Sequence, residues 1–236
     1  MYFDVRDLCN KPEQPTARFN LPADLPRGLS HWTMEGEKHT IRQQLREQRR
    51  GLSAAVVRAA NAAVCAHVRA FRPFQEARSI IAYIAAENEI SVAAVFDEVV
   101  RSGRTLYLPE TTRGGSFAPW RPGEPLARGR GGVLEPLSAA AETPERPAVA
   151  LVPVVGWDRN GTRLGRGGGF YDRVFSKLAQ GITRVGLAHD FQEFPRIQPQ
   201  PWDVPLHYVI TARGVVQCGA GAARNEWLQR GGGQLS

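Results

Sequence analysis

Residues 148–173, AVALVPVVGWDRNGTRLGRGGGFYDR, decide the fold of this chain. The run 148–155 is continuously apolar and rich in β-branched residues, a pattern typical of a strand buried on both faces of a parallel sheet. Pro153 counts against that strand, because proline removes one donor of the ladder. Residues 157–161 then predict a turn, with an Asn-Gly pair as its strongest signal. A glycine-rich loop follows, at the sheet edge where open α/β folds bind ligands.

The loop at 163–173, RLGRGGGFYDR, combines four glycines with three arginines. Glycine admits positive φ and lets a ligand approach the main chain, and consecutive exposed N–H groups form an anion-binding concavity. A helix predicted to begin at Tyr171 would point its positive end at the same place. Arginine adds forked donors for phosphate, and an acid such as Asp172 at the edge of a phosphate site commonly holds magnesium. The loop therefore predicts a phosphate site; a flexible surface loop is the alternative.

Two familiar phosphate-binding motifs do not match this loop. A P-loop ends in Gly-Lys followed by Ser or Thr, whereas Gly169 runs directly into Phe170. The dinucleotide fingerprint G-x-G-x-x-G fails as well, because its last glycine, counted from Gly165, falls on Phe170. The loop therefore belongs to another class of phosphate site.

Length and composition bound the remaining choices. With 236 residues, 42% of them hydrophobic and 22% charged, the chain has room for one sizeable globular α/β domain or two small ones. Its net charge of +7 favours anionic partners such as nucleotides. We expect no membrane and no nucleic acid as partner, because the chain has neither a long apolar run nor a known nucleic-acid motif. Cys9, Cys65 and Cys218 have neither disulfide nor zinc spacing, so we expect a cytoplasmic protein.

Helix and strand signals alternate along the middle of the chain. We expect helices at 36–50, 54–71, 92–101 and 170–179, strands at 79–84, 105–108, 117–120, 148–155, 183–187 and 208–211, and loops at 129–132 and 136–147. This alternation predicts an α/β fold of three layers, a mostly parallel sheet with helices on both faces. The catalytic domain would span 35–216, between an irregular extension at 1–34 and a loose tail at 217–236 with a short helix near 225–229.

One basic stripe is predicted along the first helix, from residues three or four apart: Lys38, Arg42, Arg46, and Arg49 or Arg50. A solvated helix face is the ordinary interpretation of such charges. Ile41 and Leu45, however, would dock an adjacent face of the helix on the core. That docking would hold Lys38 and Arg42 rigidly, where they could grip the phosphate oxygens of a nucleotide.

Taken together, these motifs resemble the 5-formyltetrahydrofolate cyclo-ligase family over residues 36–213. The glycine loop and the preceding LVPVVGWDRNGT carry most of the likeness, and KHTIR at 38–42, Glu89-Ile90 and PWDVPL at 201–206 follow in the same order. The resemblance implies an enzyme that uses ATP and Mg²⁺ to convert 5-formyltetrahydrofolate to 5,10-methenyltetrahydrofolate, releasing ADP and phosphate. It implies phosphorylation of the formyl oxygen and attack by N10. Such chemistry needs positioning and charge neutralisation more than a protein nucleophile.

The resemblance also implies roles for individual residues. Lys38 and Arg42 would contact ATP phosphates, and the nucleotide would be wrapped by Arg163, Leu164, Gly165, Arg166, Gly167, Gly168, Gly169, Phe170 and Tyr171. Arg166 would be the catalytic residue at the reacting phosphate, and Asp172 and Asp203 would hold Mg²⁺. The folate would contact Ile84, Glu89, Arg166, Gly167, Gly168, Gly169 and Phe170, with the Glu89 carboxylate bonded to the pterin ring.

Alternatives stay open for several of these residues. Taken singly, Asp172 and Glu89 fit charges near a helix start, and Asp203 fits a turn. A shift of register would move the pterin contact to Glu87. Ile84 alone would be an ordinary core residue.

Two departures from the family pattern are visible. The aromatic pair is Phe170-Tyr171, where the family commonly has two tyrosines, and His207 stands in place of an expected aspartate; we expect His207 to be structural. We expect a monomer. Two competing hypotheses are a catalytically inactive paralogue that binds nucleotide, folate or RNA, and an ATP-dependent ligase for a different acid.

Overall fold

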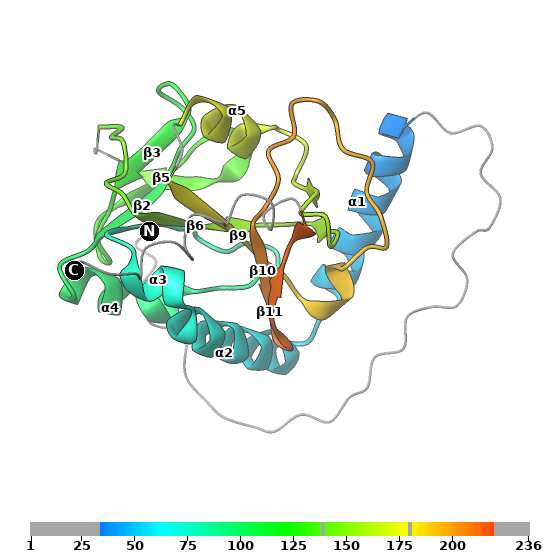
Figure 1. The fold of residues 1–236 in the computed structure, drawn as a ribbon, viewed down its shortest axis with the longest axis horizontal. Helices are drawn as coiled ribbons and strands as arrows, with labels where there is room; N and C mark the ends of the chain where they lie inside the picture. The colour runs from blue at the N-terminus through cyan, green and yellow to red at the C-terminus, as the bar shows by residue number, and fades with distance from the viewer. Residues whose placement is uncertain (1–33, 138–139, 179–180, 220–236) are drawn as a thin grey trace, which may run out of the picture.

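The computed structural model describes residues 34–137, 140–178 and 181–219 (Figure 1). The extension expected at the N-terminus and the short helix expected near 225–229 lie outside these ranges. No single helix in the described ranges combines the length and apolar composition of a membrane span, although a pair bent by 104°, Lys38–Arg50 with Ala54–Ala70, does so jointly.

A seven-stranded sheet forms the centre of the molecule, in the order β11-β10-β9-β6-β1-β2-β3. Its strands are β1 (Ser79–Ile81), β2 (Thr105–Glu110), β3 (Ser116–Pro119), β6 (Ala148–Pro153), β9 (Ile182–Leu187), β10 (Tyr208–Thr211) and β11 (Gly214–Gln217). The five inner strands are parallel, and β3 and β11 join the two edges antiparallel. The apolar run takes the central position, β6, as expected for a strand covered on both faces.

Helices cover both faces of this sheet, so the predicted three-layer α/β fold is confirmed. One face carries α2 (Ala54–Ala70), α3 (Arg72–Glu76), the short 3₁₀ helix Ala93–Val95 and α4 (Phe96–Arg101); the other carries α5 (Phe170–Lys177). Figure 1 shows α2 and α3 below the sheet and α5 above it. The remaining helix, α1 (Met34–Arg50), packs Ile41 and Leu45 against Val155 and Leu164, which confirms the expected docking.

Local sequence explains several element boundaries. The Ser53 hydroxyl accepts a hydrogen bond from the Val56 N–H at 3.4 Å and so caps α2. Pro153 is the last residue of β6, where its missing N–H interrupts the ladder only at the strand end. The strand expected at 79–84 is shorter than predicted and ends at Ile81. The chain continues without regular structure through Ala86 and turns at Glu87 and Asn88, which have φ of 51° and 57°.

Other differences concern short elements. The segment expected as a helix at 92–101 is divided into the 3₁₀ helix and α4. A hairpin of β4 (Leu126–Arg128) and β5 (Leu134–Pro136), joined through the 3₁₀ turn η3 (Arg130–Gly132), replaces part of the expected loops. No local signal predicts the edge strand β11, whose last residue, Gln217, falls in the expected tail. Each strand of these elements has three or four residues, too few for an alternation signal.

Candidate active site

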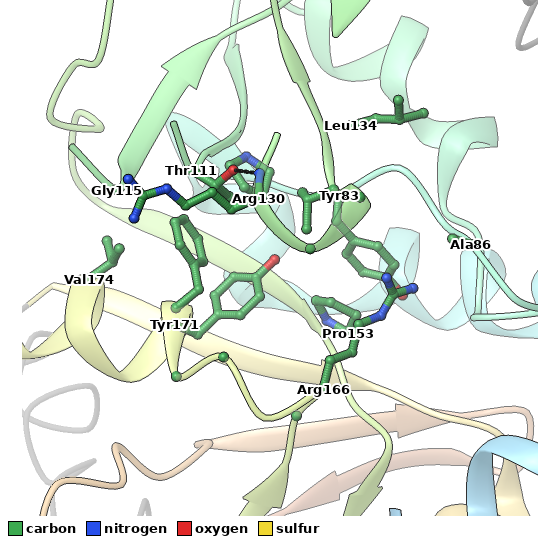
Figure 2. Close-up of a pocket in the computed structure, with 18 of the residues that line it drawn as sticks. Tyr83, Ala86, Thr111, Gly115, Arg130, Leu134, Pro153, Arg166, Tyr171 and Val174 are labelled. Atoms are coloured by element: carbon green, nitrogen blue, oxygen red, sulfur yellow. Dashed lines mark hydrogen bonds between the residues drawn. The ribbon is translucent and has the colours of Figure 1, made fainter. Parts of the chain in front are cut away.

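A cavity of about 1130 Å³ opens at the carboxyl ends of the central strands (Figure 2). Tyr83 and Ile84 enter it after β1, Thr111 after β2, and Pro153 at the end of β6. Carboxyl ends of parallel strands meet at one sheet edge, which is where α/β proteins bind ligands. The glycine loop forms another wall of the same cavity.

The glycine loop is open on the side where side chains would stand. A Cβ placed on Gly165, Gly167 or Gly168 would meet no atom within 4 Å in the described structure. Gly167 has φ of 100°, and Gly169, with φ of 60°, leads into α5 in the left-handed conformation that glycine tolerates. The Arg42 Nε donates to the Gly165 carbonyl at 3.1 Å and ties the loop to α1. The loop thus offers its backbone to a ligand at the start of α5.

Arg166 reaches across the cavity to a buried carboxylate. Its Nη2 and Nε donate to Glu89 Oε1 at 3.0 and 3.2 Å, while Glu89 Oε2 accepts from the Ala86 N–H at 3.1 Å. Glu89 is only 7% exposed, and the Arg49 guanidinium lies 3.5 Å from it. Two arginines therefore share one buried acid at the wall of the cavity.

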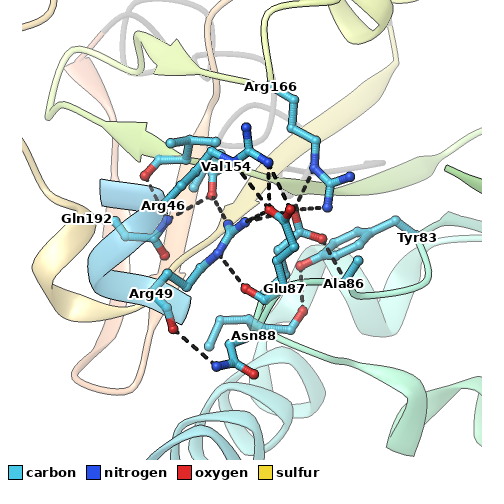
Figure 3. Close-up of polar contacts among 12 residues, drawn as sticks. Arg46, Arg49, Tyr83, Ala86, Glu87, Asn88, Val154, Arg166 and Gln192 are labelled. Carbon is cyan, nitrogen blue, oxygen red and sulfur yellow. Dashed lines mark hydrogen bonds and ion pairs between the residues drawn. The ribbon is translucent and has the colours of Figure 1, made fainter. Parts of the chain in front are cut away.

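A second acid joins this network to α1 (Figure 3). Arg46 Nη2 lies 2.8 Å from Glu87 Oε1, and this pairing lowers the pKa of Glu87 although burial opposes the shift. Arg49, 1% exposed, donates through Nε to the Glu87 carbonyl at 2.9 Å. Burial lowers the pKa of Arg49, and its attraction to Glu89 counteracts that effect. The Asn88 amide also donates to the carbonyl of Arg49 at the end of α1, at 3.2 Å, so α1 and the turn after β1 hold each other.

Two aspartates lie among the predicted nucleotide-binding residues. Asp172 Oδ1 accepts from Arg163 Nη2 at 2.7 Å and from the Val204 N–H at 2.9 Å. Asp203 Oδ2 accepts from Lys38 Nζ at 3.4 Å and from a backbone N–H at 2.8 Å. Each carboxylate thus uses one oxygen in these contacts. No group of three or more His, Cys, Asp or Glu side chains suited to a metal is present in the described residues.

Aromatic rings close the side of the cavity next to α5. Phe170 and Tyr171 pack edge to face at 5.2 Å between ring centroids, and Phe117 lies 6.0 Å from Phe170. The Tyr171 hydroxyl is buried and has no hydrogen-bond partner in the described structure, and burial raises its pKa. A neutral donor is therefore held at this wall.

Comparison with known proteins decides the family. A model described as the 5-formyltetrahydrofolate cyclo-ligase family matches residues 34–212. The chain belongs to this family. The membership expected from the sequence motifs is thereby confirmed, and with it the expected class of enzyme, a 5-formyltetrahydrofolate cyclo-ligase.

Curated cyclo-ligases resemble the chain over most of their length. The enzyme of Haemophilus influenzae is 29% identical over 74% of this chain and 97% of its own. That of Mycolicibacterium smegmatis is 32% identical over 59% of this chain and 76% of its own. The solved 5,10-methenyltetrahydrofolate synthetase of Aquifex aeolicus, 27% identical, superposes with a TM-score of 0.65 over 84% of this chain and 96% of the other.

The structure of this cyclo-ligase gathers most of the predicted site residues at one cavity. The predicted residues that line it are Ile84, Glu89, Arg163, Gly165, Arg166, Gly168, Gly169, Phe170, Tyr171 and Asp172. Five predicted residues do not line it: Lys38, Arg42, Leu164, Gly167 and Asp203. Arg42 bonds the glycine loop, and Lys38 pairs with Asp203, whose neighbour Val204 donates its N–H to Asp172. The Leu164 side chain is buried and packs with Leu45 instead of facing the cavity. His207 accepts at Nδ1 from the Arg184 N–H at 3.0 Å, a contact between backbone and side chain at the sheet.

The basic stripe on α1 is not a solvated face. Lys38 is 9% exposed and Arg49, the innermost cation, is buried, whereas Arg50 is exposed. The spacing of Arg49 four residues after Leu45 is a signal that places both on the docking side of the helix. Glu87, the alternative pterin contact, also lines the cavity but pairs with Arg46, while Glu89 pairs with Arg166.

Sequence reasoning missed the wall of the cavity that the β4–β5 hairpin supplies. Arg128, Arg130 and Gly131 line the cavity from this hairpin, together with Thr111 from the end of β2. Nothing in their local sequence marks them, because they meet the site only through the pairing of distant segments.

Proposed function

We propose that this protein binds ATP, Mg²⁺ and 5-formyltetrahydrofolate in the cavity, and forms 5,10-methenyltetrahydrofolate, ADP and phosphate. One observation carries the proposal: Arg166 belongs to the open glycine loop and at the same time bonds the buried Glu89 carboxylate. The glycine loop would bind phosphate, and Glu89 would bind a ring that has adjacent N–H donors. Arg166 contacts both sites, so the two substrates would lie close enough for a phosphoryl group to pass between them.

The nucleotide end of the site is proposed to be the glycine loop. Its glycines, which are open on the Cβ side at Gly165, Gly167 and Gly168, and the start of α5 suit phosphate oxygens. Lys38 and Arg42 stand beside the loop and would neutralise further phosphate charge. Arg163 and Tyr171 would complete this wall.

The folate end is proposed to be Glu89. Pterin offers adjacent N–H donors, and an ionised carboxylate accepts both. The side chains of Ile84 and Phe170 line the cavity and would pack on the flat ring system. Arg166 would move from Glu89 to the reacting phosphate as the substrates enter, freeing Glu89 Oε1 for the pterin.

The residues present fit magnesium in the manner usual for nucleotide sites. Mg²⁺ is commonly held by one or two carboxylates together with phosphates and water, so a preformed cluster of acids is not needed. The described contacts of Asp172 and Asp203 each engage a single oxygen, which leaves the second for the ion. When bound, the ion would neutralise phosphate charge. Asp172 lines the cavity, and Asp203 pairs with Lys38 and precedes Val204, whose N–H donates to Asp172.

The proposed reaction balances in two steps. The formyl oxygen attacks the γ-phosphorus, the bond between that phosphorus and the bridging oxygen breaks, and ADP leaves. The N10 lone pair then attacks the activated formyl carbon, the C–O bond to phosphate breaks, and the N10 proton passes to solvent. Arg166 offsets the charge on the transferred group, and the aromatic wall excludes water from the activated carbon.

Absorbance of methenyltetrahydrofolate, followed with 5-formyltetrahydrofolate, ATP and Mg²⁺, tests this proposal. We expect product from the wild-type protein and loss of product with Arg166→Ala and Asp172→Ala, while Arg72→Ala, which removes an exposed arginine far from the cavity, stays active. Full activity of both site variants would refute the assignments. Nucleotide binding without any product from the wild type would instead support the inactive paralogue.

We also propose that the protein acts as a cytoplasmic monomer whose catalytic domain is residues 35–216.

A further inference from the structure

Arg130 lines the cavity from the β4–β5 hairpin, and the reaction above gives it no role. Three arginines of the cavity have acidic partners: Arg46 pairs with Glu87, Arg163 with Asp172, and Arg166 with Glu89. Two other lining cations, Arg173 and Lys177, belong to α5 next to the glycine loop and have no ion pair in the described residues. Across the described part of the chain, no such ion pair involves Arg128 or Arg130. The hairpin therefore presents positive charge to the cavity without an internal counter-ion.

A buried relay of hydrogen bonds fixes the backbone of Arg130. Glu135 of β5, 5% exposed, accepts from the Thr111 N–H and hydroxyl, both at 2.7 Å. The same hydroxyl oxygen accepts from the Arg130 N–H at 2.8 Å. Burial alone would raise the pKa of Glu135, but hydrogen bonds from Thr112 and Thr111 outweigh it and lower that pKa. The Glu135 carboxylate thus stays ionised, and the hydrogen bonds through Thr111 fix the backbone of Arg130.

Glycine at position 129 permits this arrangement. A Cβ on Gly129 would lie 2.1 Å from Glu135 Oε2 and 2.3 Å from Thr111 Oγ1, a distance at which the relay could not form. Figure 2 shows the bond between Thr111 and Arg130 on the side of the cavity opposite Arg166, with Tyr171 between them. The backbone of Arg130 is therefore fixed at a place away from the glycine loop, and its exposed side chain starts from there.

We propose that Arg130 binds the glutamate carboxylates of the folate substrate. This inference rests on the proposed function, in which Glu89 takes the pterin ring beside Arg166. Folate is an elongated molecule with its pterin at one end and its carboxylates at the other, so the carboxylates fall on the wall facing Arg166. A guanidinium matches a carboxylate with two parallel hydrogen bonds. A phosphate of ATP has similar oxyanion chemistry, and the experiment separates the two.

The test uses the full chain with Arg130→Gln, and Arg121→Gln as the control that removes the same charge from an exposed position outside this cavity. Calorimetry without ATP compares 5-formyltetrahydrofolate with its diamide, in which both glutamate carboxylates are carboxamides. We expect Arg130→Gln to weaken binding of the acid about tenfold and to leave binding of the diamide at the wild-type value, because only the acid gains charge-assisted bonds. Arg121→Gln should match the wild type for both ligands.

Arg130→Lys keeps the charge without the fork, and we expect it to bind the acid with intermediate strength. An equal loss for acid and diamide, or no loss for either, would overturn the inference. Weaker ATP binding by Arg130→Gln with unchanged folate binding would assign the residue to phosphate and overturn it as well. Calorimetry needs no turnover, so its result is independent of product formation; absence of product from the wild type counts against the proposed function alone.

Discussion

Replacing Glu89 with glutamine removes the charge that two arginines share. Arg49 is buried, and Arg166 approaches the same oxygen at 3.0 Å, so Glu89→Gln leaves two cations facing each other without their acid. Removing one partner of a buried ion pair costs about 3–5 kcal/mol. Glu87 stays 3.5 Å from Arg49, which places the expected loss near the lower end, about 3 kcal/mol.

Glu98→Gln is the matched control, because it breaks an ion pair with Arg69 in which both side chains are more than 40% exposed. An exposed pair contributes about 0.2–1 kcal/mol. In a domain of this size each kcal/mol shifts the melting temperature by about 2–4 °C. We therefore expect Glu89→Gln to melt about 6–12 °C below the wild type and Glu98→Gln to stay within about 4 °C of it.

Urea denaturation and thermal melting measure the stability loss, and steady-state kinetics adds a second readout. If Glu89 contacts the pterin, Glu89→Gln also raises the KM for 5-formyltetrahydrofolate more than that for ATP. If Glu89→Gln and Glu98→Gln lose the same free energy of unfolding, the ion pairs of Glu89 with Arg49 and Arg166 do not behave as buried pairs, and the reasoning is refuted. A normal KM for folate in folded Glu89→Gln would refute the pterin contact.

Three further outcomes are expected. Gly129→Ala forces a Cβ to within 2.1 Å of Glu135, so urea denaturation should show a loss of about 1–3 kcal/mol, and wild-type stability would contradict the relay. Tyr171→Phe removes a buried hydroxyl without a partner, so its melting temperature should rise by an amount equivalent to about 1 kcal/mol; a fall would contradict that burial. Burial raises the pKa of the Cys218 thiol to about 12, so the folded state keeps a proton that the unfolded chain releases, and stability should fall between about pH 9 and 12 relative to Cys218→Ala. Parallel pH profiles of the two proteins would refute this last prediction.

The sequence was sufficient for the elements that carry a long local signal. The apolar run at 148–155 predicted the central strand, and the glycines at 165–169 predicted a loop open to a ligand. Both signals are contiguous, and their physical meaning does not depend on distant residues. The central strand and the glycine-loop side of the cavity could therefore be predicted from contiguous sequence alone.

The rest depended on contacts between segments far apart in the chain. Arginine is usually a surface residue, so the residue type gives no reason to expect Arg49 to be buried. Its burial depends on ion pairs with Glu87 and Glu89, which lie in the segment after β1. The hairpin that presents Arg130 consists of strands of three residues, and Glu135 anchors it from the other side of a turn. Neither set of contacts produces a helical or strand periodicity that could be recognised in the sequence.

The internal pairing of the site's cations has a consequence for how ligands would bind. Lys38, Arg163 and Arg166 each hold a carboxylate of the same chain rather than mobile ions from solution. An arriving phosphate would displace an intramolecular counter-ion, so few salt ions would be released into solution on association. Affinity for nucleotide should then vary only weakly with ionic strength, whereas Arg130, which has no ion pair in the described structure, should give its ligand a steeper dependence.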